Sequence, residues 1–197
     1  MATAERLFAE HGVTAVSSRQ ISEAAGQGDN AAVGYHFGAK TDLIKAIVHR
    51  HDRQIERSRV RMAEGIGVDG GVREWVDCLV RPLTEHLAAS GRTSWYARFS
   101  AQVITDPALR EIVTQESLVS PSLGRIVEGL RPALAELPDG VREERLEMIR
   151  GLILHTCADR ERSLAASGEP PGPAWAWTTG LLVDAITGLL LAPVSRS

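Results

Sequence analysis

Apolar residues recur every three to four positions along almost the whole chain, and no convincing run alternates at every second residue. This pattern predicts an all-α protein. Glycines, prolines and helix-capping residues divide the pattern into segments. Ahead of the first clear linker we expect a helix ending at Gly12, one capped by Ser17 or Ser18 and ending at Gly26, a short one from Asp29 or Asn30 through Tyr35, and a long one over 41–64.

The linker spans 65–71 and holds four of the chain's 18 glycines. The predicted architecture is a three-helix unit of the helix-turn-helix type over 1–45, followed by a larger helical bundle over 46–197. Beyond the linker, the periodicity predicts helices at about 72–89, 93–104, 107–118, 121–136, 140–167 and 174–192.

Composition and charge narrow the class of protein. Apolar residues make up 44% of the 197 residues, enough for a core without disulfides or metals. The net charge is −3, but residues 1–64 carry 9 Lys/Arg against 8 Asp/Glu, and the remainder is acidic. An anionic partner is therefore expected at the N-terminal part. Cys78 and Cys157 lie in apolar helical patterns, as buried free thiols do in a reducing cytoplasm.

Membrane association is not expected. Glu5, Arg6 and Glu10 interrupt the first dozen residues, so no signal peptide pattern is visible. The most apolar stretch, 180–194, contains Asp184 and is shorter than the roughly 20 residues that a membrane span needs. We expect a buried helix there.

The N-terminal unit has the physical features of a helix-turn-helix. Two short helices meet at a glycine turn, where Ala24 and Ala25 are small enough for close approach. The second helix would present small or polar residues to a major groove, where an Asn such as Asn30 can pair with adenine edges. The side chains expected to pack inside this unit are Leu7, Phe8, Ile21, Val33 and Phe37.

Four motifs occur here in order: Leu7-Phe8-x-x-x-Gly12, Ile21-x-x-x-Ala25-Gly26, Tyr35-His36-Phe37 and Lys40-x-x-Leu43. Over about 1–47 they resemble the TetR (tetracycline repressor) family of transcriptional regulators. The resemblance implies a homodimer that binds double-stranded operator DNA and a C-terminal domain that binds a small-molecule effector. For His36 we expect a packing role that positions the helix. For Lys40, which stands at a helix start, we expect a contact with a DNA phosphate. The candidate DNA-contacting residues are Ser18, Arg19, Asp29, Asn30, Ala31, Gly34, Tyr35, His36 and Lys40.

Three features differ from the family's common pattern. Gly34 stands where most members have Tyr. The turn is one residue longer than in most members, and in this it resembles a subgroup of the family from actinobacteria. The chain also starts at Met1, almost inside the first helix. Either the start is truncated or the N-terminal phosphate contacts are reduced.

Two further sets of residues are candidates for effector binding and dimerisation. Trp95 and Phe99 share a helical face, which suits either ordinary core or an apolar pocket with a few polar groups. The pocket candidates are Trp75, Leu79, Trp95, Tyr96, Phe99, Gln102, Val103 and His155. The resemblance implies a four-helix dimer interface from the last two helices of each subunit, although packing inside one subunit is equally compatible. The interface candidates are Leu146, Ile149, Ile153, Cys157, Gly180, Asp184 and Gly188.

Catalysis, cofactors and a metal site are not expected. The sequence contains no CxxC, no HExxH and no glycine-rich phosphate loop after a strand. His155 and Cys157 would diverge by about 200° on a helix and cannot act as a pair. The five arginines between Arg50 and Arg61 favour a solvated helix with ion pairs over a nucleic-acid patch.

The sequence therefore predicts a DNA-binding repressor that a small molecule releases from a roughly palindromic operator. A dimer would place two recognition helices in successive major grooves about 34–36 Å apart. Two alternatives remain, a transcriptional activator with the same fold and a ligand-binding helical protein whose N-terminal unit binds DNA poorly.

Overall fold

The computed structural model describes residues 1–26, 40–67, 69–118 and 120–194. Within these ranges the chain forms helices and no strand, which confirms the predicted all-α class. The predicted short helix from Asn30 through Tyr35 lies outside the described residues. The described helices are α1 (Ala2–His11), α2 (Ser18–Ala24), α4 (Lys40–Gly65), α5 (Val72–Ser90), α6 (Tyr96–Thr105), α7 (Pro107–Leu118), α8 (Pro121–Ala135), α9 (Asp139–Ala166) and α10 (Pro171–Leu191).

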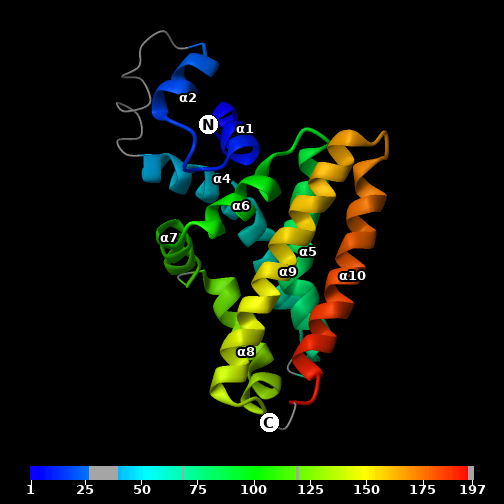
Figure 1. The fold of residues 1–197 in the computed structure, drawn as a ribbon. Helices are drawn as coiled ribbons and strands as arrows, with labels where there is room; N and C mark the ends of the chain where they lie inside the picture. Colours follow the sequence, from blue (N-terminus) through cyan, green and yellow to red (C-terminus); the bar gives the residue numbers. More distant parts are fainter. Residues whose placement is uncertain (27–39, 68, 119, 195–197) are drawn as a thin grey trace.

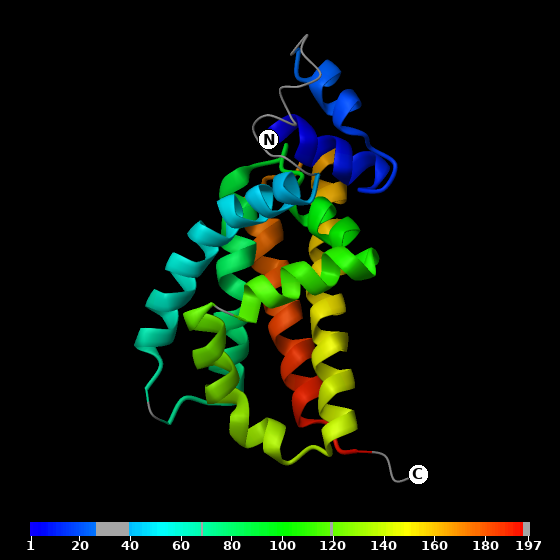
Figure 2. The same ribbon diagram turned by 90° about the vertical axis from the view of Figure 1, so that its left-hand side faces the viewer.

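The molecule is elongated, with α1 and α2 at one end and the C-terminus at the other (Figure 1). From the N-terminal end, α4 runs down along the body. The long helices α9 and α10 lie antiparallel through the body, and α5 packs between α4 and α10 (Figure 2). We call α1, α2 and the first turns of α4 the head, and the remaining helices the body.

Local sequence signals explain where helices begin and end. Ser17 caps α2 through a capping box, because its hydroxyl accepts from the amide of Gln20 while its own amide donates to the Gln20 side chain at 2.8 Å. Gly12 ends α1 with a φ of 84°, in the left-handed region that glycine enters without strain. At α8, the hydroxyl of Ser120 accepts from the amide of Leu123. The helix boundaries thus follow from short-range chemistry.

One continuous hydrophobic core joins the head to the body. Phe8 of α1 is fully buried and its ring centroid lies 6.1 Å from that of Phe99 of α6. Leu43 and Ile47 of α4 are also fully buried in this core. A head this small cannot bury its apolar face alone, so its stability depends on contact with α6.

The helix α10 is long and apolar enough to cross a membrane by length and composition, with a hydropathy of 1.4 over its most apolar window. In this fold it packs lengthwise along α5 and α9. The hydroxyls of Thr84 on α5 and Thr179 on α10 lie 2.7 Å apart in the buried contact. The inner face of α10 accordingly forms part of the core of the body.

The close contact between α5 and α8 yields a test of the packing. An alanine Cβ at Gly129 would overlap the buried indole ring of Trp75, whereas one at Gly124 of the same helix would meet open space. We expect Gly129→Ala to lower the free energy of unfolding by about 1–3 kcal/mol through overpacking. The matched variant Gly124→Ala should be neutral or raise it by up to about 1 kcal/mol. Urea denaturation of both variants measures the difference, and equal stabilities would contradict this packing.

Candidate functional site

The head presents polar side chains around a buried apolar centre. Phe8 and Ile21 are buried, and Lys40 stands at the start of α4 with its ammonium 5.9 Å from the centre of the Phe8 ring. Arg19 is exposed on α2 and pairs with Glu23 at 2.7 Å. The described part of the head therefore carries solvent-accessible cations on a rigid apolar base.

A buried polar cluster joins the head to the body. Glu5 of α1 and His86 of α5 both bond to His51 of α4, with Glu5 Oε2 to His51 Nε2 at 3.1 Å and His86 Nε2 to His51 Nδ1 at 2.7 Å. Tyr96 of α6 stacks on the His51 ring, with the centroids 3.9 Å apart. These four residues, which we call the histidine junction, bring together side chains from four helices.

The bonding pattern fixes the direction of the hydrogen bonds. A carboxylate only accepts, so Nε2 of a neutral His51 donates to Glu5 and its Nδ1 accepts from His86. Burial, together with the charges of His51 and Arg50, lowers the pKa of His86 to about 4, although the charge of Glu5 acts to raise it. His86 is therefore neutral near pH 7, and its Nε2 carries the proton that it donates to His51.

A cavity of about 450 Å³ lies in the body between α4, α5, α6, α7, α8 and α9. This volume falls within the range of roughly 300–1,000 Å³ typical of small-molecule sites. Most of its wall is aliphatic, including Ile55, Leu83, Val103, Ile126 and Leu130. The cavity is thus suited to a largely apolar molecule.

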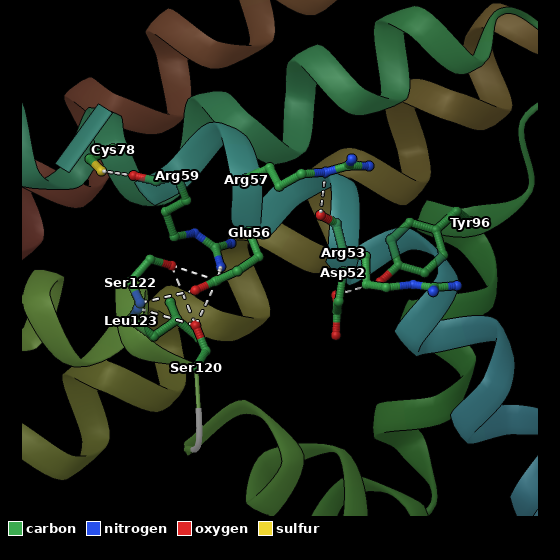
Figure 3. Close-up of polar contacts among 10 residues, drawn as sticks. All are labelled: Asp52, Arg53, Glu56, Arg57, Arg59, Cys78, Tyr96, Ser120, Ser122 and Leu123. Atoms are coloured by element: carbon green, nitrogen blue, oxygen red, sulfur yellow. Dashed lines mark hydrogen bonds and ion pairs between the residues drawn. The ribbon is translucent and has the colours of Figure 1, made fainter. Parts of the chain in front are cut away.

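Tyr96 belongs to both the cavity wall and the histidine junction. Its hydroxyl donates to Asp52 at 3.2 Å, and Asp52 also lines the cavity (Figure 3). Burial raises the pKa of the Tyr96 hydroxyl, so that it remains a donor. A molecule in the cavity would therefore touch a residue that stacks on His51.

A second polar group lies where α4 meets the start of α8 (Figure 3). Glu56 accepts from the hydroxyls of Ser120 and Ser122 at 2.7 and 2.6 Å and from the Ser122 amide at 3.0 Å. Burial acts to raise the pKa of Glu56, but these bonds and the charge of Arg59 together lower it. Glu56 thus stays ionised and holds α8 against α4.

Two family models match the chain. "Bacterial regulatory proteins, tetR family" matches residues 1–47, and "Tetracyclin repressor-like, C-terminal domain" matches residues 77–188, more than half of the chain. The chain belongs to the TetR family. The TetR family consists of DNA-binding transcriptional regulators, so the predictions of a DNA-binding regulator and of a non-enzymatic function are confirmed.

Curated relatives agree with this assignment. The chain is 30% identical over 171 residues to the HTH-type transcriptional repressor AcnR of Corynebacterium efficiens, covering 84% of this chain and 79% of the relative. It is 33% identical over 110 residues to AcnR of Corynebacterium glutamicum, covering 54% of this chain and 50% of that relative. Both organisms belong to the actinobacteria, the group suggested by the longer turn.

The TetR-type head places three of the candidate DNA-contacting residues. Ser18 begins α2, Arg19 follows it on the surface, and Lys40 begins α4. The structure therefore holds the described candidates on two helix starts of one small unit. The other six lie outside the described residues: Asp29, Asn30, Ala31, Gly34, Tyr35 and His36.

Three of the eight pocket candidates line the cavity, namely Leu79, Tyr96 and Val103. The other five do not: Trp75 packs on Gly129, Trp95 lies 4.0 Å from the Arg98 guanidinium, Phe99 stacks near Phe8, Gln102 lies against Gly12, and His155 is exposed. Helical spacing identified the buried face of α6 but could not distinguish the side packed on α1 from the side facing the cavity.

The charged wall of the cavity differs from what the sequence predicts. Arg59 was interpreted as one of five solvated arginines, yet only 13% of its side chain is exposed and it lines the cavity. Arg53, Arg57 and Arg61 of the same run are exposed, as expected. The contact of Glu56 with Ser120 and Ser122, which covers this side of α4, has no signal in the local sequence.

The dimer candidates divide into two groups. Ile149, Ile153 and Cys157 are buried and line the cavity, and the partly exposed Leu146 also lines it. This stripe of α9 faces inward because α6 packs against it. The outward side of α9 instead carries Met148 and Leu152. On α10 the candidates are exposed: Gly180, Gly188, and Asp184, which pairs with Arg73.

The low pKa of His86 predicts an acid-sensitive fold. An unfolded His titrates near 6.5 and folded His86 near 4, so folding is opposed once the pH falls below 6.5. Between pH 7 and pH 5 the protein should lose roughly 1 kcal/mol of unfolding free energy from this residue, because solvent partly screens the half-buried ring. The variant His86→Gln, which keeps a donor, should flatten that part of the pH profile, whereas the exposed-site variant His155→Gln should not. Chemical denaturation across this pH range is the measurement, and an unchanged slope in His86→Gln would refute the assignment.

Proposed function

We propose that the protein is a transcriptional repressor that binds operator DNA as a homodimer and releases it when a small molecule fills the body cavity. The observation that carries this proposal is the position of Tyr96, shared by the cavity wall and the histidine junction. The names of the two AcnR relatives, both repressors, support the sign of regulation. A repressor works where its operator DNA is, which is the cytoplasm of a bacterium. The two buried free thiols are in keeping with that location.

The histidine junction gives the cavity a physical route to the head. An effector acts only through different affinities for two arrangements of the protein. A molecule that displaces the Tyr96 ring disturbs its stacking on His51, and His51 holds Glu5 of the first head helix. Because Glu5 is buried, its partner cannot be replaced freely by water. The favoured response is a new orientation of α1, and with it of the DNA-contacting face.

The outer faces of α9 and α10 support a dimer. Large apolar side chains stand exposed there, with Trp177 65% exposed and Met148 55% exposed, beside Leu152, Leu181 and Leu191. Exposed apolar side chains gathered on two neighbouring helices favour an interaction site in a soluble protein. The exposed Gly180 and Gly188 allow another helix to approach closely. Two copies of this antiparallel pair form a four-helix interface that covers these side chains.

DNA binding is tested on the head. Lys40→Ala removes a cation at the start of α4 and should weaken binding to duplex DNA from upstream of the protein's own gene about three- to tenfold, with a salt dependence reduced by about one unit of slope. Tyr35→Ala should weaken binding as well. Arg131→Ala, an exposed arginine of α8, is the matched control and should bind as the unmodified protein does. Fluorescence anisotropy at several salt concentrations measures these affinities; wild-type binding by both head variants would rule out this DNA-contacting face.

The dimer is tested on α10. Trp177→Glu with Leu181→Glu places two charges in the proposed interface and should weaken dimerisation by at least about 2 kcal/mol, roughly thirtyfold. Ala135→Glu, an exposed position on α8, is the control and should leave the dimer intact. Light scattering coupled to size exclusion gives the mass, and circular dichroism verifies folding. A monomeric unmodified protein, or a dimer unaffected by the double change, would count against this interface.

A further inference from the structure

The polar part of the cavity wall carries more cations than anions. Arg59, Arg110 and Arg150 all line the cavity, whereas Asp52 supplies the single carboxylate among the lining residues in the described part of the chain. Burial raises the pKa of Asp52, while the bond from Tyr96 and the charge of Arg59 act against this rise. The cavity is therefore electrostatically prepared for an anion.

Two of these arginines are already partly neutralised. Arg110 and Arg150 approach opposite oxygens of Glu147 at 3.4 and 3.6 Å, and both side chains are well exposed to solvent. Arg150 also donates to the Thr114 hydroxyl at 2.9 Å. Their charges are shared and hydrated, so they contribute to the potential of the cavity more than to a specific contact.

Arg59 has an ion pair of similar length, but its side chain is far more buried, with 13% exposed against 46% for Arg110 and 39% for Arg150. Its nearest carboxylate is Glu56, at 3.5 Å from Nη1, and Glu56 already accepts three bonds from Ser120 and Ser122. Its Nε is buried and donates no hydrogen bond to any of the described residues. Buried donors without an acceptor are rare in native proteins. An arginine fork is also the side chain best matched to a carboxylate.

The rest of the wall sets the size and polarity of the ligand. The cavity volume of about 450 Å³ lies in the lower half of the range typical of small-molecule sites. Hydrocarbon surface comes from Ile55 of α4, the helix that carries Arg59, and from Ile126 and Leu130 of α8. With one buried guanidinium and a mostly aliphatic wall, the cavity suits a ligand with one small anionic group and a hydrocarbon part.

We propose that the cavity binds an amphipathic monocarboxylate, whose carboxylate accepts from Arg59 and whose hydrocarbon part lies against the aliphatic wall. The regulatory consequence of this binding rests on the repressor function proposed above. The binding itself is independent of DNA and can be measured on the protein alone.

The experiment compares two probes with the same tail, sodium decanoate and 1-decanol, by calorimetric titration of the full chain near neutral pH and below their aggregation concentrations. Decanoate should bind at least about tenfold more tightly than decanol, because only it completes a charge-assisted pair. Arg59→Gln should remove this preference by weakening decanoate about tenfold and leaving decanol nearly unchanged. Arg57→Gln, an exposed arginine on the same helix, is the matched control and should keep the preference.

Three results overturn the proposal: decanol binding as tightly as decanoate, no binding of decanoate, or full decanoate affinity in Arg59→Gln. Circular dichroism verifies that Arg59→Gln is folded. Should it unfold, Arg59→Lys, which keeps the charge but loses the fork, takes its place and should show an intermediate preference. If the unmodified protein prefers decanoate but does not bind operator DNA, the repressor function is wrong and the ligand assignment stands. If it binds operator DNA but shows no preference for decanoate, the ligand assignment is wrong and the repressor function stands.

Discussion

The contact on which the rest of the structure depends is the buried bond between Glu5 of α1 and His51 of α4, at 3.1 Å. The head is too small to form a core of its own, so its orientation is set by what α1 touches in the body. Those contacts are Glu5 with His51 and Phe8 with Phe99. Both lie beside α6, the helix whose first residue is Tyr96. Any movement of α6 therefore changes the support beneath the head.

The same helix is anchored on its other side to the proposed dimer interface. Glu161 of α9 is buried and accepts from the amides of Ala97 and Arg98 at 3.2 and 3.0 Å, and from the Arg98 side chain at 3.1 Å. A carboxylate bonded to the first amides of a helix is stabilised by the helix dipole. The start of α6 is thus held by α9, while its side chains contact α1 and line the cavity. Head, cavity and α9 meet on one short helix.

The sequence was sufficient to predict the helices because their ends are encoded locally. Gly12, Pro107 and Pro121 stop or start helices within one or two residues of the predicted boundaries. The cavity could not be predicted in the same way. Phe99 and Tyr96 are both buried aromatics of α6, yet only Tyr96 lines the cavity, because the head occupies the side of Phe99. Likewise, Arg57 and Arg59 point to nearly opposite sides of α4, and α8, which begins at Pro121, packs against α4 from a distant part of the sequence.

Hydropathy has a similar limit on α10, whose composition equally fits a membrane span. Trp175 is 2% exposed and Trp177 is 65% exposed, although they are two residues apart and contribute equally to any average of hydrophobicity. Direction separates them, because residues two apart on a helix point to nearly opposite sides. A helix with one apolar face against α5 and exposed apolar side chains on its other face has the hydropathy of a helix in lipid. The helices that pack on α10 distinguish the two cases, because α5 and α9 both carry exposed charged residues that a lipid environment would not accommodate.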